Sequence, residues 1–546
     1  MLYKKDFNHL SKNFVSRHSY STRKLVLGEK DEAGVQEDSA NAIGSFVKIY
    51  LLRSSIHGVR YLVENDLKLF ERLIWAFIVI LSIFATIYIS ILLANRFNSS
   101  PLQTVIESTT HPVVNIVFPA VTICNYNRID WAKIEEAKKK FIPNATKEVE
   151  DLFVKFVSKM EIFKFGNFDS FDELEDVNLH PLDFLNISQL NEFMSHSCEA
   201  MFVNGCWWRY RTFRCCDIFV RQKSEFGFCF AFNSVVNEVG LTKWEQNEPD
   251  WPVKTSTYGA WSGLRVNLVA RASSRVPGSN YPIGMMVIIH HPFGWPNDGL
   301  FVPAGTSAAV ALKPMLSYAM PSTRRYDPVS RDCIFVDEAS DPKYLNLRGL
   351  QYMKTNCLSA CRQNYMVDKC NCTVEPFFPI GSYKACTASD FHCLLRHNDL
   401  FNFMISGSES DNEEKNQSAM ICSCMQECAT LDYQTEILPM HLLKDNFTEE
   451  MIILDVHYQH GTLIKYRTDV VYGWLDLLVA FGGIAGLFMG ASVLSGVELF
   501  YYFTIGFIVY MRDQFGKMKT SRKGKAAPVP RKILFVGPKE ILAGKY

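Results

Sequence analysis

The sequence lacks a net charge, because its 57 Lys and Arg residues balance 57 Asp and Glu residues over 546 positions. A nucleic-acid partner needs a basic surface for its phosphates, so none is expected. The chain also lacks a nucleophile elbow, a phosphate-binding loop and a metalloprotease motif, which predicts no enzymatic activity and no cofactor. The first 40 residues lack the apolar core of a signal peptide.

Cysteine is absent from both ends of the chain. All sixteen cysteines lie between Cys124 and Cys428, and an even number confined to one stretch predicts disulfides in an oxidising, extracellular compartment. Spacing alone does not fix how eight disulfides would pair. The same part of the chain carries N-glycosylation sequons, at Asn144, Asn186, Asn371, Asn416 and Asn446.

Long apolar runs are scarce, and two of them fit a bilayer. Leu73–Leu93 has 21 residues without a charge, which matches the ~20 residues that cross a membrane. With no signal peptide ahead of it, this segment is expected to act as the signal anchor. Trp474–Tyr510 is the second run. Basic residues precede the first run and follow the second, which predicts both termini in the cytoplasm and the cysteine-rich part outside.

These two spans divide the chain into six expected parts. They are a cytoplasmic tail at 1–44, a segment at 45–72, the first span at 73–93, an extracellular domain at 94–472, the second span at 473–511 and a cytoplasmic tail at 512–546. The stretch GEKDEAGVQEDSANAIG in the first tail is expected to be a flexible linker.

The expected extracellular domain mixes helices and strands, which predicts an α+β fold. Apolar runs rich in β-branched residues predict strands at 115–125, 283–293 and 449–458, and the last of these is expected to lead into the second span. Apolar positions three and four apart predict helices at 130–141 and 146–163.

The second span carries glycines and acids that a plain anchor does not need. Gly482, Gly486 and Gly490 recur every four residues, and one interpretation is a small-residue face that packs on another helix. That interpretation leaves Asp476 and Glu498 unexplained, because a charge in the bilayer is costly unless it faces water or a partner. On one unbroken helix the two acids would lie within ~40° of each other and ~33 Å apart. A cation pathway along this face is therefore predicted.

The second run is also too long for one straight span. Its 37 residues exceed the ~17–25 of a membrane helix, so it must extend out of the bilayer, tilt or break. Gly490, Ala491 and Ser492 are small enough for several chains to converge there. Their carbonyls or short side chains would then replace part of the hydration shell of a cation. Irregular backbone at membrane depth is tolerated where it lines such a path.

Several motifs together resemble one channel family. GGIAGLFMGASVLSGVELFYY resembles the second membrane segment of the degenerin/epithelial sodium channel family, with its G-x-S signature ahead of a glutamate. SSIHGVRYL resembles the His-Gly gating motif, FPAVTICN the first ectodomain strand, GFCFAFN the G-x-C-x-x-F-N motif, and CLSAC, KCNC and CSC the thumb cysteines. The chain is thus identified as a member of this family over about residues 45–512, most similar to its insect pickpocket branch.

The resemblance implies a membrane protein with two spans and a hand-like extracellular domain, in which a β-sheet palm carries a helical finger and thumb. It implies a voltage-independent, sodium-selective channel of the plasma membrane that amiloride blocks, assembled as a homo- or heterotrimer of related subunits. Na⁺ would be the permeant ion and Ca²⁺ a candidate blocker. An extracellular chemical, osmotic or mechanical stimulus, including a bound ligand, would open it.

The resemblance also assigns roles to particular residues. Gly490, Ala491 and Ser492 take the position of the selectivity filter, with Asp476, Gly482, Gly486 and Glu498 expected along the pore. His57 and Gly58 take the position of the gating motif. Basic residues after the second span predict contact with anionic lipid, although topology alone already explains them.

The resemblance implies six disulfide pairs: Cys124–Cys229, Cys333–Cys428, Cys357–Cys424, Cys361–Cys422, Cys370–Cys393 and Cys372–Cys386. Four cysteines remain without an assigned partner: Cys198, Cys206, Cys215 and Cys216. The adjacent pair Cys215-Cys216 departs from the commoner spacing of the family.

Val479 is a second departure from the family. It aligns with a position outside the filter where a small residue is usual and where bulky residues tend to hold such channels open. The hypothesis is a channel that is partly active at rest, and the alternative is a neighbourhood that compensates for the larger side chain.

Two further clusters have a structural and a functional interpretation. His290 and His291 near Asp298 could bind a metal, but adjacent residues of a strand point to opposite faces, which favours a structural role. The acidic run at 169–176 could bind protons or calcium, although such runs are more often solvated surface.

Two functions of other classes remain open at this point. One is a non-conducting auxiliary subunit or two-pass receptor whose spans only anchor it. The other is an ATP-gated two-span channel, which would need clustered lysines for phosphates that the sequence does not show in a suitable setting. The filter, Glu498 and the His-Gly pair favour a cation channel.

Overall fold

The computed structural model describes residues 39–99, 102–379, 383–406, 419–441, 449–471 and 473–513. The chain forms two compact units, which we call the helical unit, Met1–Asn95 with Trp474–Tyr546, and the cysteine-rich unit, Arg96–Gly473. The first collects the two ends of the chain, and the second is one continuous segment.

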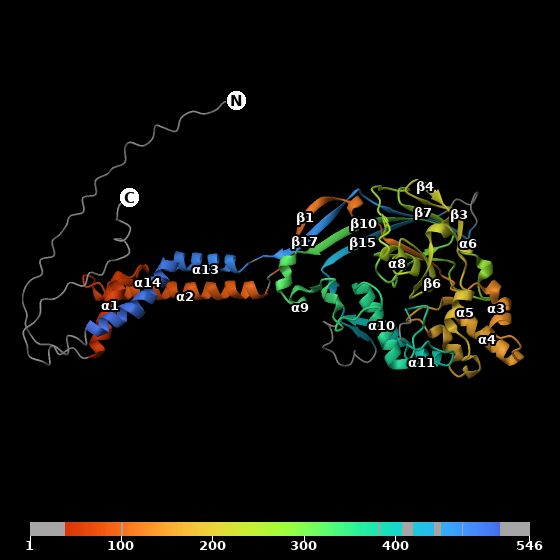
Figure 1. Cartoon of the computed structure of the whole chain (residues 1–546), viewed down its shortest axis with the longest axis horizontal. Coiled ribbons are helices and arrows are strands. Elements are labelled where there is room, and N and C mark those ends of the chain that lie inside the picture. Colours follow the sequence, from red (N-terminus) through yellow and green to blue (C-terminus); the bar gives the residue numbers. More distant parts are fainter. Residues whose placement is uncertain are drawn as a thin grey trace, which may run out of the picture. The chain divides into compact units, whose positions relative to one another are not determined.

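The cysteine-rich unit contains two main β-sheets (Figure 1). The larger sheet has the order β1-β17-β10-β16-β7-β3-β4, with β15 also paired to β10. Its strands are β1 Leu102–Pro112, β3 Phe202–Trp208, β4 Arg211–Phe213, β7 Leu264–Val269, β10 Thr306–Ala319, β15 Ala429–His441, β16 Met451–Tyr458 and β17 Thr462–Val470. The smaller sheet has the order β5-β6-β2-β8-β9, with β2 Ala120–Asn125, β5 Val220–Ser224, β6 Gly227–Phe232, β8 Gly284–His290 and β9 Leu300–Pro303.

One apolar core joins the two sheets. Along β16, Ile452, Leu454 and Val456 are fully buried, as the two-residue period of a strand with one apolar face requires. Ile123 of β2 and Phe232 of β6 belong to the same buried cluster. The sheets therefore face each other across shared side chains.

A second core lies among the helices of the cysteine-rich unit and is rich in phenylalanine. Phe391 of α11 is buried against two other buried phenylalanines. Its ring meets that of Phe156 of α4 edge-on at 5.2 Å between centroids, and that of Phe163, after α4, in a tilted contact at 5.5 Å. The helices of this unit are α3 Ile134–Phe141, α4 Lys147–Lys159, α5 Ile187–Met194, α6 Cys198–Met201, α7 Cys215–Ile218, α8 Glu238–Glu245, α9 Pro328–Arg331, α10 Lys354–Cys370, α11 Phe391–Arg396 and α12 Asn398–Asn402. Helices far apart in sequence thus share one core.

All sixteen cysteines are paired in the structure. Six of the pairs are those that the resemblance implies: Cys124–Cys229, Cys333–Cys428, Cys357–Cys424, Cys361–Cys422, Cys370–Cys393 and Cys372–Cys386. The four cysteines left unassigned by the sequence pair as Cys198–Cys216 and Cys206–Cys215. Both of these bridges end on α7, so the adjacent cysteines fasten one short helix at two points.

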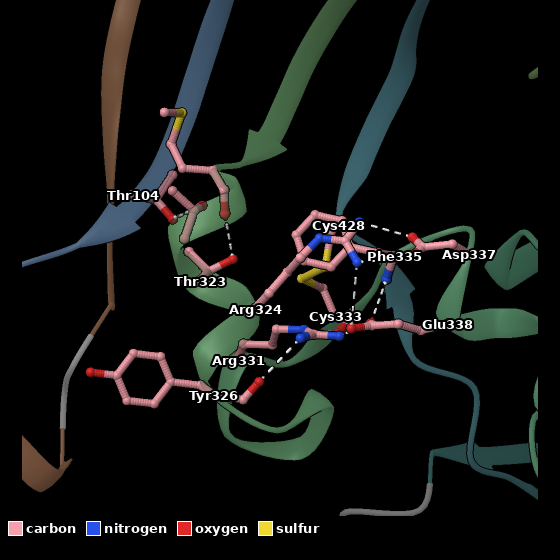
Figure 2. The surroundings of a disulfide bond; sticks show 12 residues. Thr104, Thr323, Arg324, Tyr326, Arg331, Cys333, Phe335, Asp337, Glu338 and Cys428 are labelled. Carbon is pink, nitrogen blue, oxygen red and sulfur yellow. Dashed lines mark hydrogen bonds and ion pairs between the residues drawn. A yellow bond between two sulfur atoms is a disulfide. The ribbon is translucent and has the colours of Figure 1, made fainter.

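Figure 2 shows the surroundings of the Cys333–Cys428 disulfide, which joins β11 Cys333–Ile334 to the residue after β14 Gln426–Glu427. Arg324 donates two hydrogen bonds of 2.8 Å to the carboxylate of Asp337. Arg331 pairs with Glu338 and also donates to the carbonyl of Cys333 at 2.9 Å. Charge-assisted bonds thus surround this disulfide on the segment that follows β10.

The helical unit contains α1 Ser39–Arg53, α2 Leu69–Ser99, α13 Trp474–Met489, α14 Val493–Tyr501 and a π-helix at Tyr502–Gly506. Two helices are long and apolar enough to cross a membrane, Leu69–Phe97 and Val493–Asp513, and Trp474–Met489 is a shorter apolar helix. The second apolar run is therefore interrupted, which is one of the three outcomes that its length allows.

The structure corrects three details expected from the sequence. The strand expected at 115–125 begins only at Ala120, because a 3₁₀ turn occupies Val113–Asn115. The strand β16 does not lead into the second span, since β17 lies between them. The last residues of the expected linker in the first tail are helical, because α1 begins at Ser39. Small, polar residues form a helix here because the aromatic face of α1, described below, packs on another helix.

Candidate functional site: the break in the second apolar segment

The second apolar segment stops being helical at three residues (Figure 1). The α13 helix ends at Met489, and Gly490 adopts φ +61°, in the left-handed region that favours glycine. The backbone N–H of Ala491 then donates to the carbonyl of Ala485 at 3.2 Å, six residues back, instead of continuing the α-helical pattern. The filter residues suggested by the family resemblance therefore lie at the break.

Ser492 restarts the helix by capping α14. Its hydroxyl accepts from the backbone N–H of Ser495 at 3.3 Å, while the hydroxyl of Ser495 accepts from the backbone N–H of Ser492 at 3.2 Å. This reciprocal capping box satisfies backbone donors that the break would otherwise leave unpaired. Ser492 thus has a local structural role in addition to its place in the motif.

The His-Gly loop packs directly on the break. The backbone N–H of His57 donates to the carbonyl of Met489, the last residue of α13, at 2.9 Å. A Cβ atom at Gly490 would lie 2.1 Å from Nδ1 of His57, closer than any side chain tolerates. The structure therefore brings together two motifs that stand more than 400 positions apart in sequence.

Gly58 faces the other membrane helix. It adopts φ +81°, and a Cβ atom there would lie 3.0 Å from Cγ2 of Val79 on α2. Tyr61, in the turn that follows, stacks on Trp75 of α2 with ring centroids 4.4 Å apart. The loop thus fills the space between α2 and the break, and a side chain on either glycine would push it out of place.

Ser55 also reaches the break, and sequence reasoning missed it. Its hydroxyl donates to the hydroxyl of Ser495 at 2.8 Å, and Ser495 is buried. The three hydroxyls of Ser55, Ser495 and Ser492 form a connected set, with the last two 3.3 Å apart. The only sequence signal is a serine pair ahead of His57, which by itself does not indicate a contact with α14.

The two acids do not share one helical face. Asp476 lies in the first turn of α13 and is exposed, whereas Glu498 lies on α14 and is half-buried. Since the chain leaves the helix between them, the prediction of a common face on an unbroken helix is wrong. The prediction fails at the break, because the backbone of Gly490–Ser492 does not keep the constant turn per residue about one axis that an α-helix has.

The small residues of α13 face outward in the single chain. Gly482 and Gly486 are exposed, and a Cβ atom at Gly482 would meet nothing within 4 Å. Val479 is 68% exposed. Within the described residues, this face of α13 is therefore not used to pack against the helices of its own chain.

The C-terminal end of the second segment is covered by α1. Phe46 and Tyr50 of α1 are buried against aromatic rings of the π-helix and beyond, with Tyr50 5.2 Å from Phe503 and Phe46 5.4 Å from Phe507 between centroids. A π-helix is a rare feature that is frequent at functional sites. The segment ahead of the first span therefore contacts the second one at two places, the break and the π-helix.

The histidine pair has a structural role in the cysteine-rich unit. His290 is buried, its Nε2 lies 2.9 Å from the hydroxyl of Thr122 and its Nδ1 lies 2.9 Å from the carbonyl of His291. Burial lowers the pKa of His290 and of His291 to about 4. Both ring nitrogens of His290 are thus engaged by the protein, which agrees with the structural interpretation and leaves no free donor for a metal.

The acidic run is divided among separate partners. Asp169 pairs with the side-chain amide of Asn398 on α12, and burial together with neighbouring acids raises its pKa. Glu173 forms an ion pair of 2.7 Å with Lys159. Among the described residues, no three acids of this run, which also includes Asp172, Glu175 and Asp176, bring carboxylate oxygens within 4.8 Å of one another.

Three of the predicted glycosylation sites lie in the described residues. Asn144, Asn186 and Asn371 are all exposed, as attachment of a glycan requires. Asn416 and Asn446 lie outside the described residues. Glycosylation of these positions stays a prediction.

The chain combines two apolar segments near its ends with a disulfide-rich β domain between them. In the second segment, a capped helix break packs against a glycine loop. Together these features are typical of two-span membrane channels. A family model described as "Amiloride-sensitive sodium channel" matches residues 50–502. The chain belongs to this family, the degenerin/epithelial sodium channels, whose members are ion channels and not enzymes.

Curated relatives support this assignment. Pickpocket protein 19 of Drosophila melanogaster is 30% identical over 479 residues, which cover 86% of this chain and 92% of the relative. Sodium channel protein Nach of Drosophila ananassae is 26% identical, covering 83% and 85%. Acid-sensing ion channel 1C of Danio rerio is 22% identical, covering 86% and 85%. The similarity to insect members of the family is thus confirmed over most of the chain.

Proposed function

We propose that the chain is a subunit of a voltage-independent, amiloride-sensitive and sodium-selective channel that an extracellular stimulus opens. The observation that supports this most is the interrupted helix at Gly490–Ser492, where the backbone leaves the α-helical hydrogen-bond pattern within an apolar segment. Such irregular backbone is tolerated in a bilayer only inside protein or along a water-filled path. Carbonyls that replace water around a small cation can select between ions.

The channel would be a homo- or heterotrimer with related subunits in the plasma membrane, with both termini in the cytoplasm. The exposed small residues of α13, Gly482 and Gly486, are suited to close approach of neighbouring helices. Around a common axis, three copies of the break would converge with Glu498 on the cytoplasmic side. The family is oligomeric with related subunits, and a closed ring of such subunits surrounds a central axis.

The test is expression in oocytes under two-electrode voltage clamp, alone and with candidate partner subunits. A sodium current that amiloride blocks and that falls when sodium is replaced by a large organic cation is expected. Surface biotinylation separates a silent channel from one that never reaches the membrane. Absence of current in every combination, despite surface delivery, would count against conduction.

That negative outcome would favour the second candidate, a non-conducting auxiliary subunit or two-pass receptor. The large folded ectodomain with eight disulfides supports a binding role in either case. An auxiliary subunit would change the current of a conducting relative while Glu498→Gln in this chain leaves permeation unchanged.

Val479 supports a channel that is partly active at rest. Its side chain is 68% exposed in the single chain, on a helix that has glycine three and four positions further on, at Gly482 and Gly483. Val479→Ser is expected to lower the resting, amiloride-sensitive current, because a smaller side chain permits closer packing of the closed state. An unchanged resting current in a conducting channel would instead indicate compensating neighbours.

A further inference from the structure

A cavity of about 340 Å³ lies in the cysteine-rich unit between the two sheets' ends and α8. Its volume falls within the ~300–1,000 Å³ of small-molecule sites. Residues from β3, β4, α7, β5, β6 and α8 line it, together with the segment that follows α8. The cavity therefore gathers six elements that only the tertiary fold brings together.

The walls of the cavity are aromatic. Trp208 and Phe232 line it with their rings tilted at 4.9 Å between centroids, and Phe213 of β4 lies beside them. Trp251 closes another side, held by a 3.1 Å hydrogen bond from its Nε1 to the carbonyl of Gly240. Flat, rigid rings of this kind suit an aromatic ligand, and their faces attract a cation.

The charged residues of the lining are mostly acidic. Asp217, Glu248 and Asp250 contribute three carboxylates against the single ammonium of Lys243. Lys243 is already engaged, because it lies 3.8 Å from Glu248 and 4.9 Å from the ring centroid of Trp251. Arg214, outside the lining, lies 4.0 Å from Asp217, so two cations face three carboxylates. The remaining negative charge favours a cationic ligand over an anionic one.

Two disulfides preorganise one wall. Cys206–Cys215 ties β3 to the first residue of α7, and Cys198–Cys216 ties α6 to the second. Asp217 is the next residue of α7, so its backbone directly follows two cross-linked residues. The cysteines whose pairing the sequence left open thus position one carboxylate of the cavity, and preorganisation lowers the cost of binding.

The lining also contains an unsatisfied polar group. Ser234 is 1% exposed, and its hydroxyl has no hydrogen-bond partner within the part of the chain that the structure describes. A buried hydroxyl without a partner costs free energy, which a ligand with a polar atom would recover. Its neighbour Asn233, at φ +59°, accepts from the backbone N–H of Val253 at 2.8 Å and so closes the floor.

We propose that this cavity binds a small aromatic amine as an extracellular ligand of the channel. The aromatic body would lie among Trp208, Phe213 and Trp251, and the ammonium group at the carboxylates of Asp217 and Asp250. The amine would be the stimulus that opens the channel, and only this consequence of binding rests on the proposed function. Binding itself depends on the cavity alone.

The test compares tryptamine with tryptophol, which has the same ring and a neutral hydroxyl in place of the ammonium. Affinities are measured by microscale thermophoresis on the full chain purified in detergent. Tryptamine is expected to bind about tenfold more tightly, because attraction to partly exposed carboxylates and ring faces adds to the shared burial of the indole. Equal affinities, or no binding of either probe, would overturn the proposal.

Three variants locate the binding. The double substitution Asp217→Asn with Asp250→Asn is expected to lower tryptamine affinity about tenfold and to leave tryptophol unchanged. Val239→Trp, at a half-exposed lining position of α8, should fill the cavity and abolish binding of both probes. Glu245→Gln, an exposed acid of the same helix outside the lining, is the matched control. If the cavity variants bind tryptamine as the control does, the site is wrong.

The outcome separates this inference from the proposed function. A chain that binds tryptamine selectively but passes no current refutes the channel and keeps the site. A chain that conducts sodium but shows no preference for tryptamine refutes the site and keeps the channel. Since the substituted side chains are exposed, an unchanged melting temperature confirms that each variant is folded.

Discussion

The two units of the molecule bury their side chains in opposite ways. In the cysteine-rich unit, Phe163 and Val456 are fully buried in two separate cores, and eight disulfides cross-link the chain. In the helical unit, none of the apolar window of Leu69–Phe97 is buried, and only 11% of that of Val493–Asp513. The first unit is complete as a single chain, whereas the second exposes apolar surface that lipid or other subunits must cover.

The difference shows which contacts each unit depends on. The cysteine-rich unit has many, so a single change is absorbed unless it removes a cross-link or a buried polar group. The helical unit has few within the described part of one chain: the break is held by the backbone of His57 and the hydroxyl of Ser55, and the π-helix region by the aromatic rings of α1. Small changes there are expected to alter conduction more than stability.

The largest effect is expected from Gly490→Ala in the helical unit. A Cβ atom would lie 2.1 Å from His57 Nδ1, and φ +61° disfavours any residue but glycine by ~1–2 kcal/mol. The current should fall at least about tenfold at equal surface expression. Gly483→Ala, where a Cβ atom meets nothing within 4 Å, is the matched control and should conduct. Equal currents from Gly490→Ala and Gly483→Ala would contradict the conclusion that conduction depends on the few contacts at the break.

In the cysteine-rich unit, the largest effect is expected from removing the Cys124–Cys229 bridge. Its cysteines are 105 positions apart, against nine for Cys206–Cys215. From loop-closure entropy, replacing both cysteines by serine costs about 5 kcal/mol for the longer loop and about 3 kcal/mol for the shorter.

Thermal unfolding of the purified full chain measures this difference as the shift in melting temperature, and surface biotinylation measures its consequence in cells. The Cys206–Cys215 double variant is the control, since it removes the same atoms from a short loop. Equal shifts for the two double variants would mean that loop length does not govern the stability of this unit.

A smaller effect is expected when the pH is lowered on the cysteine-rich unit. Burial lowers the pKa of His290 from 6.5 to about 4, so the folded state keeps the ring neutral while the unfolded chain takes up a proton. The contribution of His290 to the free energy of unfolding is complete above pH 6.5. It is lost as the pH falls towards 4, by ~1.4 kcal/mol per pH unit. His290→Gln should therefore melt with a weaker dependence on acid pH than the parent.

The matched control is His460→Gln, at an exposed position, which should retain the dependence of the parent. Burial raises the pKa of Glu225 and so acts in the opposite direction. That contribution is the same in parent and variant and cancels in the comparison. Identical pH profiles for parent and His290→Gln would contradict the assignment to His290.

The smallest effect is expected from Ser55→Ala in the helical unit. The substitution removes one hydrogen bond of 2.8 Å to Ser495, a net contribution of ~1 kcal/mol. The permeability of sodium relative to potassium should change a few-fold while surface expression is unchanged. Ser54→Ala is the control, because the hydroxyl of Ser54 bonds within its own loop, accepting from the backbone N–H of Ile56 at 3.2 Å. Ser55→Thr, which keeps the hydroxyl, should restore the parent ratio.

The sequence carried the local features well. Three predictions rest on a property of the residues themselves. They are the apolar length of Leu73–Leu93, the backbone freedom of the glycine at Gly490 and the redox chemistry of an even number of cysteines. Helix α4 follows the expected helical period, and β8 is the buried strand that its apolar, β-branched residues predict. These predictions succeeded because the cause lies within a few neighbouring residues.

The sequence failed where the cause is not local. The single face of Asp476 and Glu498 was wrong because one residue at φ +61° resets the rotation of everything after it. The last strand β17 was missed because its polar residues alternate with few apolar ones, and its pairing with β1 and β10 stabilises it. The bridges of Cys198 and Cys206 depend on α7 returning beside β3, which no spacing indicates.

The residues alone were sufficient to establish two apolar segments, a cysteine-rich domain between them and a second segment too long and too rich in glycine for one plain span, because apolar length, disulfide chemistry and the conformational freedom of glycine act locally. The tertiary structure decided that His57 and Ser55 lie against that break, and that Asp217 and Trp251 line one cavity. Those contacts join positions hundreds of residues apart or elements held by disulfides. They exist only once close packing in three dimensions selects which distant side chains meet.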